Sequence, residues 1–402
     1  MNKTQLQVSA FLFPYVQFIY ELVLAQLELS AFDFEFSLEN NLKAMKIWGG
    51  DSERFCRRTA YFQYIGDRES LYSRIVAKNR TRSVNLYLTH GIYPYKGKFH
   101  PQMIRALLNI MGLSEGETVL DPFVGSGTLA LEAQLLGINS VCFDISPLCV
   151  LQTKVKTESV RFLDEIKGAW QNVQKEANKL FRRDYERDML DLIRSFDPGP
   201  VQDFYMMGFL VAISDTERRR KSFIQAFLKN IPLMISSLED YQELIRGEKL
   251  QLGTVRVSEG DARALPLADE SVDGILTSPP YSIALDYVAN DAHALRFMGK
   301  DITEFRNAVI GVRGRGEERI HLYNQDMREA LGEMARVLKP GRYASLVIGN
   351  ATHQGKVINT VDFVIREAER CGLSLIRNID KVIFGLYNVM QRENILIFVK
   401  RG

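Results

Sequence analysis

Cysteine is scarce in this sequence, and its spacing argues against two common kinds of site. The four thiols include no C-x-x-C pair and are widely scattered, which disfavours a structural zinc site and a disulfide framework: Cys56, Cys142, Cys149 and Cys371. No cluster of histidine, cysteine and carboxylate residues has the spacing of metal ligands either. We therefore expect reduced thiols in a cytoplasmic protein, and a reaction that needs no metal.

Long apolar runs and a strong net charge are also missing. The apolar stretch from Phe11 to Leu29 is interrupted by Glu21 and Glu28, and no small-residue cleavage site follows a basic region. It fits neither a membrane span nor a signal peptide, and we interpret it as a buried strand and helix. Lysine plus arginine (51) against aspartate plus glutamate (49) leaves a charge of +2. Attraction to nucleic acid must therefore come from local patches.

What is present is a pattern of short apolar runs that alternate with amphipathic helices. The chain has 402 residues, 46% of them hydrophobic, which suffices for a buried core and two or three domains. From Thr118 the alternation predicts a mostly parallel α/β sheet. The predicted strands are residues 118–120, 140–143, 254–258, 272–276, 343–348, 373–379 and 394–399, and helices are predicted at 128–136, 326–337 and 361–369. A turn is predicted at Lys339-Pro340-Gly341.

Helical periodicity extends from about Pro147 to Arg246, which is too long for one crossover helix. We therefore predict four segments. Residues 1–86 form a small N-terminal α/β extension, 87–159 the first part of the α/β domain, 160–249 an inserted helical subdomain, and 250–402 the second part of the α/β domain.

A glycine loop lies between the first predicted strand and its helix. In Asp121-Pro122-Phe123-Val124-Gly125-Ser126-Gly127-Thr128 the glycines allow a tight turn and a close approach to a ligand. No Gly-Lys-Ser/Thr follows and the third glycine of the dinucleotide fingerprint is missing, so phosphate is not its obvious ligand. Asp144 ends the next strand, where an acidic side chain can accept hydrogen bonds from a cofactor ribose. A helix N-cap is the alternative for Asp144.

A second motif, Thr277-Ser278-Pro279-Pro280-Tyr281, follows the predicted strand 272–276 and so lies at the same edge of the sheet. The lone pair of an exocyclic amino nitrogen is delocalised into the base, so the nitrogen is a poor nucleophile until acceptors draw its hydrogens out of plane. The Ser278 side chain and the Pro279 carbonyl can be those acceptors. The two prolines fix the backbone, and Tyr281 offers a face on which a base can stack.

Together the two segments resemble motif I (F-x-G-x-G) and motif IV (S/D/N-P-P-Y/F) of S-adenosylmethionine-dependent amino-methyltransferases, the N4-cytosine and N6-adenine DNA methyltransferases. The resemblance implies a Rossmann-like class I fold with a seven-stranded, mostly parallel sheet, S-adenosylmethionine as cofactor, and nucleic acid as partner. The serine form of motif IV is typical of the cytosine-N4 branch. C5-cytosine methylation needs a thiolate, usually in a Pro-Cys pair, and no cysteine here follows a proline.

The resemblance also assigns site residues. Asp121 and the loop around it would face the methionine end of the cofactor, Asp144 the ribose, and Gly260-Asp261-Ala262 the adenine. The segment His90 to Pro101 looks like motif X, with Lys98 and Phe99 as the candidate contacts. The full cofactor set is Lys98, Phe99, Asp121, Pro122, Phe123, Gly125, Ser126, Gly127, Thr128, Asp144, Asp261 and Ala262, and the catalytic set is Ser278, Pro279, Pro280 and Tyr281.

Several other segments are candidates for contact with the substrate. Asp286, Tyr287 and Asn290 follow motif IV and are candidates for the base pocket, with helix surface as the alternative. Basic residues interleaved with tyrosines between Arg74 and Arg105 suit phosphate contacts and stacking, or simply a solvated face: Lys78, Arg80, Arg82, Lys96 and Lys98 with Tyr87, Tyr93 and Tyr95. The run Arg218-Arg219-Arg220-Lys221 is a candidate for backbone contact or a solvated charge run. The run Arg313-Gly314-Arg315-Gly316 is a candidate for a loop that closes over the substrate, or a disordered surface loop.

The sequence does not decide whether the substrate is DNA or RNA. In DNA enzymes a segment between motifs I and IV can recognise the target, which makes residues 160–249 the candidate reader. Residues Glu21 to Glu28 faintly resemble the start of the RNA-binding THUMP domain of tRNA guanosine-N2 methyltransferases. Those enzymes carry aspartate where this chain has Ser278, so the RNA alternative is a cytidine in tRNA or rRNA. A third alternative is a catalytically silent binding module, against which the intact Ser278 to Tyr281 motif argues.

Overall fold

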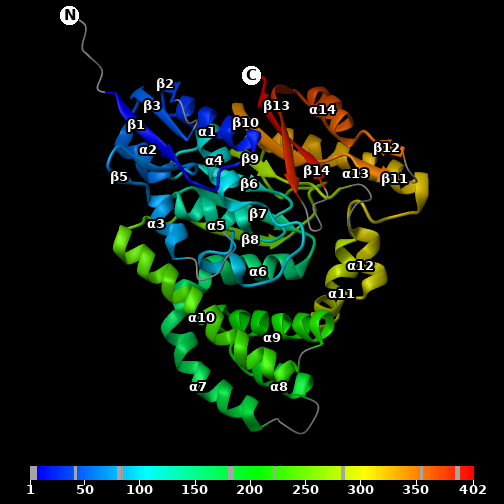
Figure 1. Cartoon of the computed structure of the whole chain (residues 1–402). Coiled ribbons are helices and arrows are strands. Elements are labelled where there is room, and N and C mark those ends of the chain that lie inside the picture. Colours follow the sequence, from blue (N-terminus) through cyan, green and yellow to red (C-terminus); the bar gives the residue numbers. More distant parts are fainter. Residues whose placement is uncertain are drawn as a thin grey trace, which may run out of the picture.

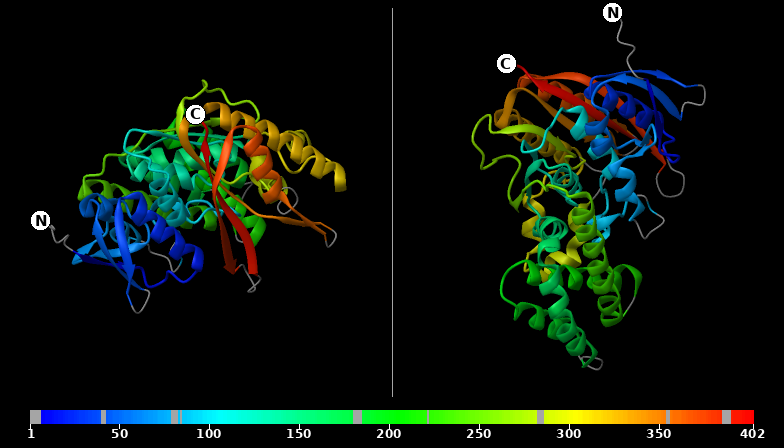
Figure 2. Two further views of the ribbon diagram at one scale, coloured as in Figure 1. Left: turned by 90° about the horizontal axis from the view of Figure 1, so that it is seen from above. Right: turned by 90° about the vertical axis from the view of Figure 1, so that its left-hand side faces the viewer.

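The computed structural model contains two large β-sheets, a small two-stranded sheet, and a group of long helices that extends away from the large sheets (Figures 1 and 2). It describes residues 7–39, 43–78, 83, 85–179, 185–220, 222–281, 286–353, 356–384 and 390–402. No helix within these ranges combines the length and the apolar character needed to cross a membrane.

The larger sheet has seven strands in the order β13-β14-β10-β9-β6-β7-β8. Its strands are β6 (Thr118–Asp121), β7 (Asn139–Asp144), β8 (Val255–Glu259), β9 (Val272–Thr277), β10 (Leu338–Ile348), β13 (Leu373–Phe384) and β14 (Met390–Lys400). Neighbours from β10 to β8 pair in parallel, whereas β14 is antiparallel to both β10 and β13. This is the Rossmann-like class I methyltransferase fold, and it confirms the predicted sheet.

Helices cover both faces of this sheet, because successive side chains of a strand point to opposite sides. Val119 and Leu276 pack with the helices α4 (Pro101–Ile110), α5 (Thr128–Leu135) and α6 (Pro147–Glu158). Leu120 and Ile275, one position away, pack with α13 (Gly316–Val337) and α14 (Thr360–Arg370). The predicted helices at 128–136 and 361–369 are thus confirmed.

The N-terminal residues form a separate antiparallel sheet in the order β2-β3-β1-β4-β5. Its elements are β1 (Val8–Leu12), α1 (Ile19–Ala31), β2 (Phe34–Leu38), β3 (Ala44–Gly49), α2 (Ser52–Arg58), β4 (Phe62–Ile65), β5 (Arg68–Glu69) and α3 (Leu71–Ala77). Glu28 of α1, which interrupts the apolar stretch, is fully buried. Its carboxylate accepts hydrogen bonds from Thr59 Oγ1 (2.7 Å), Ala60 N (2.9 Å) and Asn109 Nδ2 of α4 (2.7 Å). A buried carboxylate needs such partners, and here they join this unit to the methyltransferase sheet.

The predicted insertion is helical. It consists of α7 (Leu163–Lys179), α8 (Tyr185–Arg194), α9 (Pro200–Arg219) and α10 (Phe223–Glu248), which project from one end of the molecule (Figure 1). Both α9 and α10 contact the 3-10 turn at residues 159–162, and α9 packs along α6. The insertion is therefore anchored beside the glycine-loop half of the sheet.

Some elements differ from the predictions. Lys339-Pro340-Gly341 is not a turn between elements but lies inside β10, where the pairing with β9 shifts register between Leu338 and Tyr343 and Gly341 has φ +72°. Helix α13 starts at Gly316 rather than Asp326. The sequence pattern missed α11 (Tyr287–Phe297), α12 (Ile302–Ala308), β11 (Ala351–His353), β12 (Lys356–Ile358) and the short 3-10 helix η1 (Leu88–Gly91).

Candidate active site and cofactor pocket

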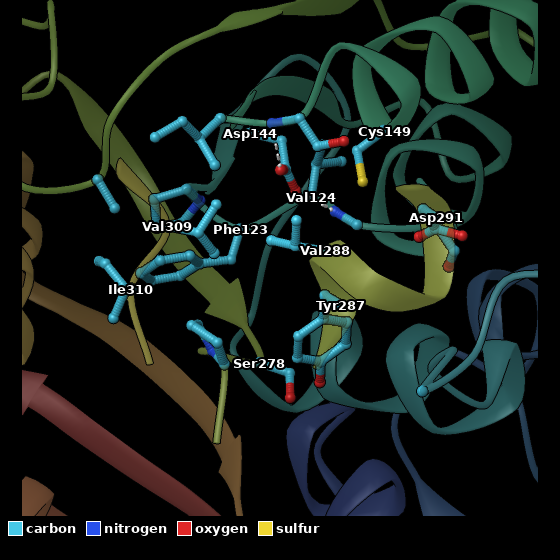
Figure 3. A pocket seen from close by; sticks show the side chains of 18 of the residues that line it. Phe123, Val124, Asp144, Cys149, Ser278, Tyr287, Val288, Asp291, Val309 and Ile310 are labelled. Atoms are coloured by element: carbon cyan, nitrogen blue, oxygen red, sulfur yellow. Dashed lines mark hydrogen bonds between the residues drawn. The ribbon is translucent and has the colours of Figure 1, made fainter. Parts of the chain in front are cut away.

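A pocket of about 1000 Å³, partly open to solvent, lies at the carboxyl ends of β6, β7, β8 and β9. This is the edge at which parallel α/β sheets bind ligands. In Figure 3 Asp144 lies at one end of the view, and Ser278 and Tyr287 lie together at the other. The predicted residues that line the pocket are Phe99, Pro122, Phe123, Gly125, Ser126, Asp144, Asp261, Ala262, Ser278 and Pro280.

The glycine loop is braced from two sides. Gly125 N donates to Asp144 Oδ2 (2.9 Å), and the Gly125 carbonyl accepts from Gln152 Nε2 (2.6 Å). The fully buried Lys156 of α6 donates to the Ser126 carbonyl (2.5 Å), and burial holds its pKa well below the ordinary value. These bonds fix the loop before a ligand arrives. Gln152 and Lys156 were not predicted, since their role depends on how α6 packs.

Asp121 connects the glycine loop to motif IV. Its Oδ1 accepts from Thr277 Oγ1 (2.6 Å) and from Phe123 N (3.1 Å), and the residue is 1% exposed. Its Oδ2 has no hydrogen-bond partner among the described residues, and burial raises the pKa of the carboxyl to about 7. A buried carboxylate oxygen without a partner is costly, and a cationic group of a ligand would supply the partner. The residues present therefore fit the ammonium group of S-adenosylmethionine.

Asp144 holds the backbone on both sides of the pocket, while the N-cap of α6 is Ser146 rather than Asp144. Its Oδ2 takes the Gly125 N–H and its Oδ1 takes the Ser146 N–H (2.9 Å), just before α6 begins. The side chain also lines the pocket, and burial raises its pKa. Each carboxylate oxygen accepts more than one hydrogen bond, so these contacts leave capacity for ribose hydroxyls.

The Ser278 hydroxyl donates its proton to the Val347 carbonyl of β10 (2.8 Å). Because the proton is used in this bond, the Ser278 hydroxyl can only accept a hydrogen bond from a ligand. Ser278 lines the pocket in which such a ligand would lie. Pro280 lines the same pocket, whereas Pro279 and Tyr281 do not. The predicted catalytic tetrapeptide thus reaches the pocket through two of its four side chains.

The Tyr281 side chain is held from behind. Its hydroxyl donates to Glu393 Oε1 of β14 (2.7 Å), and the second oxygen of Glu393 pairs with Lys381 of β13. Burial opposes ionisation of Glu393, yet Lys381 and the Tyr281 hydroxyl keep its pKa below the ordinary value. Tyr287 of α11, which lines the pocket beside Ser278, is the better placed aromatic side chain for a base (Figure 3).

Of the three residues predicted after motif IV, only Tyr287 reaches the pocket. Asp286 caps α11 by accepting from Ala289 N (3.0 Å) and pairs with Arg306. Asn290 accepts from Lys96 Nζ (2.9 Å). The remaining pocket wall was missed because it comes from α11, α12 and the segment after α12: Val288, Asp291, Leu295, Phe305, Ala308, Val309 and Ile310.

Four predicted cofactor residues are not part of the pocket lining: Lys98, Asp121, Gly127 and Thr128. Asp121 is buried next to Pro122 and Phe123, which do line it. Lys98 donates to the His90 carbonyl (2.8 Å), and burial lowers its pKa to about 8. Gly127 precedes α5 in a left-handed conformation (φ +72°), and a Cβ there would lie 2.6 Å from Thr153 Oγ1, so it needs to be glycine for helix packing. Thr128 is buried and bonds Ser126 Oγ (2.9 Å), so Gly127 and Thr128 shape the glycine loop from behind.

The carboxylate of Asp261, the residue predicted to face the adenine, is paired with an arginine. Arg263 donates to both oxygens of Asp261 (2.6 to 3.0 Å) and to Asp326 (2.8 Å). Burial opposes ionisation of Asp261, but this pairing lowers its pKa. Asp261 is thus already engaged by an arginine, and Ala262 beside it presents only a small apolar surface to the pocket.

Among the described residues of the basic segment, three cations are paired with carboxylates. Arg74 pairs with Glu248 (2.6 Å), Lys78 with Glu243 (2.8 Å), and the fully buried Arg105 with Glu132 (3.4 Å). Tyr87 and Tyr93 are buried in the core, and Tyr95 faces the pocket. Arg313 pairs with Asp326 rather than lying free in a loop. Arg80, Arg82 and Lys221 lie outside the described residues.

No group of three or more histidine, cysteine or carboxylate residues in the described ranges could hold a metal ion. All four cysteines are free thiols. The pocket is lined by hydrogen-bond acceptors such as Asp144 and Ser278, by the backbone of the glycine loop, and by aromatic side chains such as Phe123 and Tyr287.

Comparisons with known proteins find similarity to methyltransferases. The family UPF0020, described as RMKL-like, methyltransferase domain, matches residues 92–194. The type II methyltransferase M.BsoBI of Geobacillus stearothermophilus is 23% identical over 404 residues, which cover 85% of this chain and 76% of that protein. The type II methyltransferase M.MjaII of Methanocaldococcus jannaschii is 29% identical over 192 residues, 46% of this chain and 34% of that protein.

A third relative has a nucleic-acid substrate in its name. The tRNA (guanine(10)-N2)-dimethyltransferase of Methanothermobacter thermautotrophicus is 39% identical over 83 residues, 20% of this chain and 24% of that protein. Fold, pocket and relatives together show an S-adenosylmethionine-dependent methyltransferase that is similar to type II methyltransferases and, over a shorter segment, to a tRNA methyltransferase.

Proposed function

We propose that this enzyme transfers a methyl group to an exocyclic amino nitrogen of a nucleic-acid base, N4 of cytosine in DNA. The observation that carries the proposal is the position of Ser278. It lines the same pocket as the glycine loop, and its proton is already committed to the Val347 carbonyl. An acceptor held in this way suits an amino group, which must have its hydrogens drawn out of the ring plane before it can attack.

The chain's own residues hold the reactants. S-adenosylmethionine supplies a methyl group on a positively charged sulfur. Asp121 Oδ2 would accept from the ammonium group and Asp144 from the ribose, and Phe123 to Ser126 border the pocket. The Ser278 oxygen and the Pro279 carbonyl would accept hydrogen bonds from the two amino hydrogens, so that the nitrogen lone pair would face the methyl group. Formation of the N–C bond would break the S–C bond, leave its electron pair on sulfur, and release the surplus amino proton to water. Tyr287, with Tyr281 behind it, stacks on the base.

Three features support the choice of base and polymer. The serine form of motif IV favours cytosine N4, and two relatives are type II methyltransferases. Helices α7 to α10 (within residues 160–249) lie between the two motifs in sequence, which makes them the proposed target reader. The N-terminal unit (residues 1–86) is a second proposed nucleic-acid contact. A cytidine in rRNA or tRNA is the alternative substrate, favoured by the tRNA-methyltransferase relative.

The test is single-turnover methyl transfer from labelled S-adenosylmethionine to duplex DNA, single-stranded DNA, rRNA and tRNA, with mass spectrometry of the product nucleoside. Ser278→Ala should lower the rate by at least about tenfold while leaving cofactor affinity within twofold, because its acceptor acts mainly in the transition state. The matched control is Ser271→Ala. Ser271 precedes β9 as Ser278 follows it, and it is exposed and donates to the Ala268 carbonyl (2.6 Å).

Labelled N4-methylcytosine in DNA is the expected product. Label only in RNA would move the proposal to the alternative polymer. Binding of S-adenosylmethionine with no transfer to any of the four substrates would favour a silent module, and a wild-type rate in Ser278→Ala would remove the proposed role of motif IV.

A further inference from the structure

Helix α11 forms one wall of the cofactor pocket. Its residues Tyr287, Val288, Asp291 and Leu295 line the cavity opposite the glycine loop. The helix packs against α9 of the insertion and against α12. The shape of the pocket therefore depends on how an element outside the methyltransferase sheet holds α11.

Phe209 of α9 packs edge-on against Phe297 of α11 (ring centroids 5.1 Å apart), and one charged side chain of the insertion adds hydrogen bonds to this contact. Arg218, in the last turn of α9, donates from Nη2 to the Asn290 carbonyl (2.7 Å) and to Asp291 Oδ1 (3.2 Å), and from Nη1 to the Pro94 carbonyl (3.2 Å). Pro94 precedes Tyr95, Gly97 and Phe99, which line the pocket from another side. A single planar guanidinium thus ties together the insertion, α11 and the segment that resembles motif X.

The ion pair with Arg218 is important for stability because the Asp291 carboxylate is buried. The residue is 8% exposed and borders the cavity, and burial raises its pKa to about 6 even beside Arg218. Tyr93 Oη donates to it from 3.5 Å. A buried carboxylate that loses its cation is strongly destabilised, so α11 is favoured in the position that keeps Asp291 against Arg218.

We propose that Arg218 is a positioning residue for cofactor binding, which holds α11 and the Pro94 segment in the conformation that encloses S-adenosylmethionine. The proposal rests on the cofactor site of the proposed function but not on the base or polymer. It gives the insertion a second task beside target recognition. Arg218 is held by three acceptors on other elements, whereas its neighbour Arg219 pairs along its own helix with Asp215 (3.0 Å).

The experiment is titration of the full chain with S-adenosylmethionine alone, for the wild type, Arg218→Gln, Arg218→Lys and the control Arg219→Gln. Arg218→Gln should raise the Kd at least about tenfold, because the enclosing conformation becomes a minor state. Arg218→Lys should give a smaller rise, since an ammonium keeps the charge but not the planar fork. Arg219→Gln should stay within twofold.

Amide hydrogen exchange separates positioning from a general loss of structure. In Arg218→Gln, exchange should accelerate in residues 287–297 while α8 and α10 keep their wild-type protection. An unchanged Kd in folded Arg218→Gln, an equal loss in Arg219→Gln, or accelerated exchange throughout α7 to α10 would each overturn the proposal. Since no nucleic acid is present, a wrong base or polymer cannot change the result.

Discussion

Asp121 should bind the cofactor as a carboxylate, and Asp121→Asn should separate this role from folding. The side chain is 1% exposed, with Oδ1 bonded to Thr277 and Phe123 and Oδ2 without a partner among the described residues. Asparagine keeps an oxygen for the first two bonds but puts an uncharged amide in place of Oδ2. A hydrogen bond to a charged group contributes about 1.5–3 kcal/mol, so the Kd for S-adenosylmethionine should rise roughly 10- to 150-fold.

The pH dependence of cofactor affinity is a second test of the role of the Asp121 carboxylate. Burial raises the pKa of Asp121 to about 7, and the cationic ligand binds the ionised form. Wild-type affinity should therefore increase as pH rises, by roughly 25-fold between about pH 5.5 and 7.5. The pKa is raised in the folded state, so between about pH 4 and 7 the folded chain holds a proton that the unfolded chain has lost. Asp121 should therefore lower the free energy of unfolding of the unligated protein as pH rises through that window. Asp121→Asn should remove this pH dependence of stability.

Isothermal titration at several pH values and thermal unfolding without cofactor measure both effects. Asp273→Asn is the control, because Asp273 lies near the start of β9 and pairs with Lys339 outside the pocket. It should leave the affinity and its pH dependence as in the wild type. An unchanged Kd in Asp121→Asn, or equal wild-type affinity at both ends of the pH range, would refute the reasoning.

Two further substitutions test contacts described above. Tyr281→Phe removes a buried hydrogen bond to Glu393 and should lower the free energy of unfolding by about 1–3 kcal/mol and the single-turnover rate severalfold; chemical denaturation that matches the wild type would show that this contact contributes nothing. Gly127→Ala should destabilise the fold by about 1–3 kcal/mol, because of φ +72° and the 2.6 Å approach of Cβ to Thr153. If Gly127→Ala lost only cofactor affinity, with an unchanged melting temperature, the packing role would be wrong.

The fold could be predicted from the sequence because its signals are local. Each central strand is a short apolar run, and both motifs directly follow strands, so their meeting at one sheet edge follows from parallel topology. Ser278 and the glycine loop do line one pocket.

Other features depend on contacts between residues far apart in the sequence, and there prediction failed. Arg74 meets Glu248, 174 positions later, so a run that looks basic in sequence is neutralised in space. Tyr281 is held by Glu393, 112 positions later, which no local pattern indicates. The function of Gly127 required knowledge of Thr153 on α6. Helices α11 and α12 carry mixed polar and apolar residues without clear periodicity, so the pocket wall that they form was not foreseen.

The place of β14 in the sheet has a consequence for synthesis on the ribosome. The N-terminal sheet pairs strands within residues 8–69 and can form early. The methyltransferase sheet cannot close until β14 emerges, because β14 separates β10 from β13, with pairs such as Tyr343 to Val399. A nascent chain that has reached residue 384 therefore exposes two strand edges, a state prone to aggregation. Pairing of β14 (Met390–Lys400) with both neighbours covers these two edges in one step.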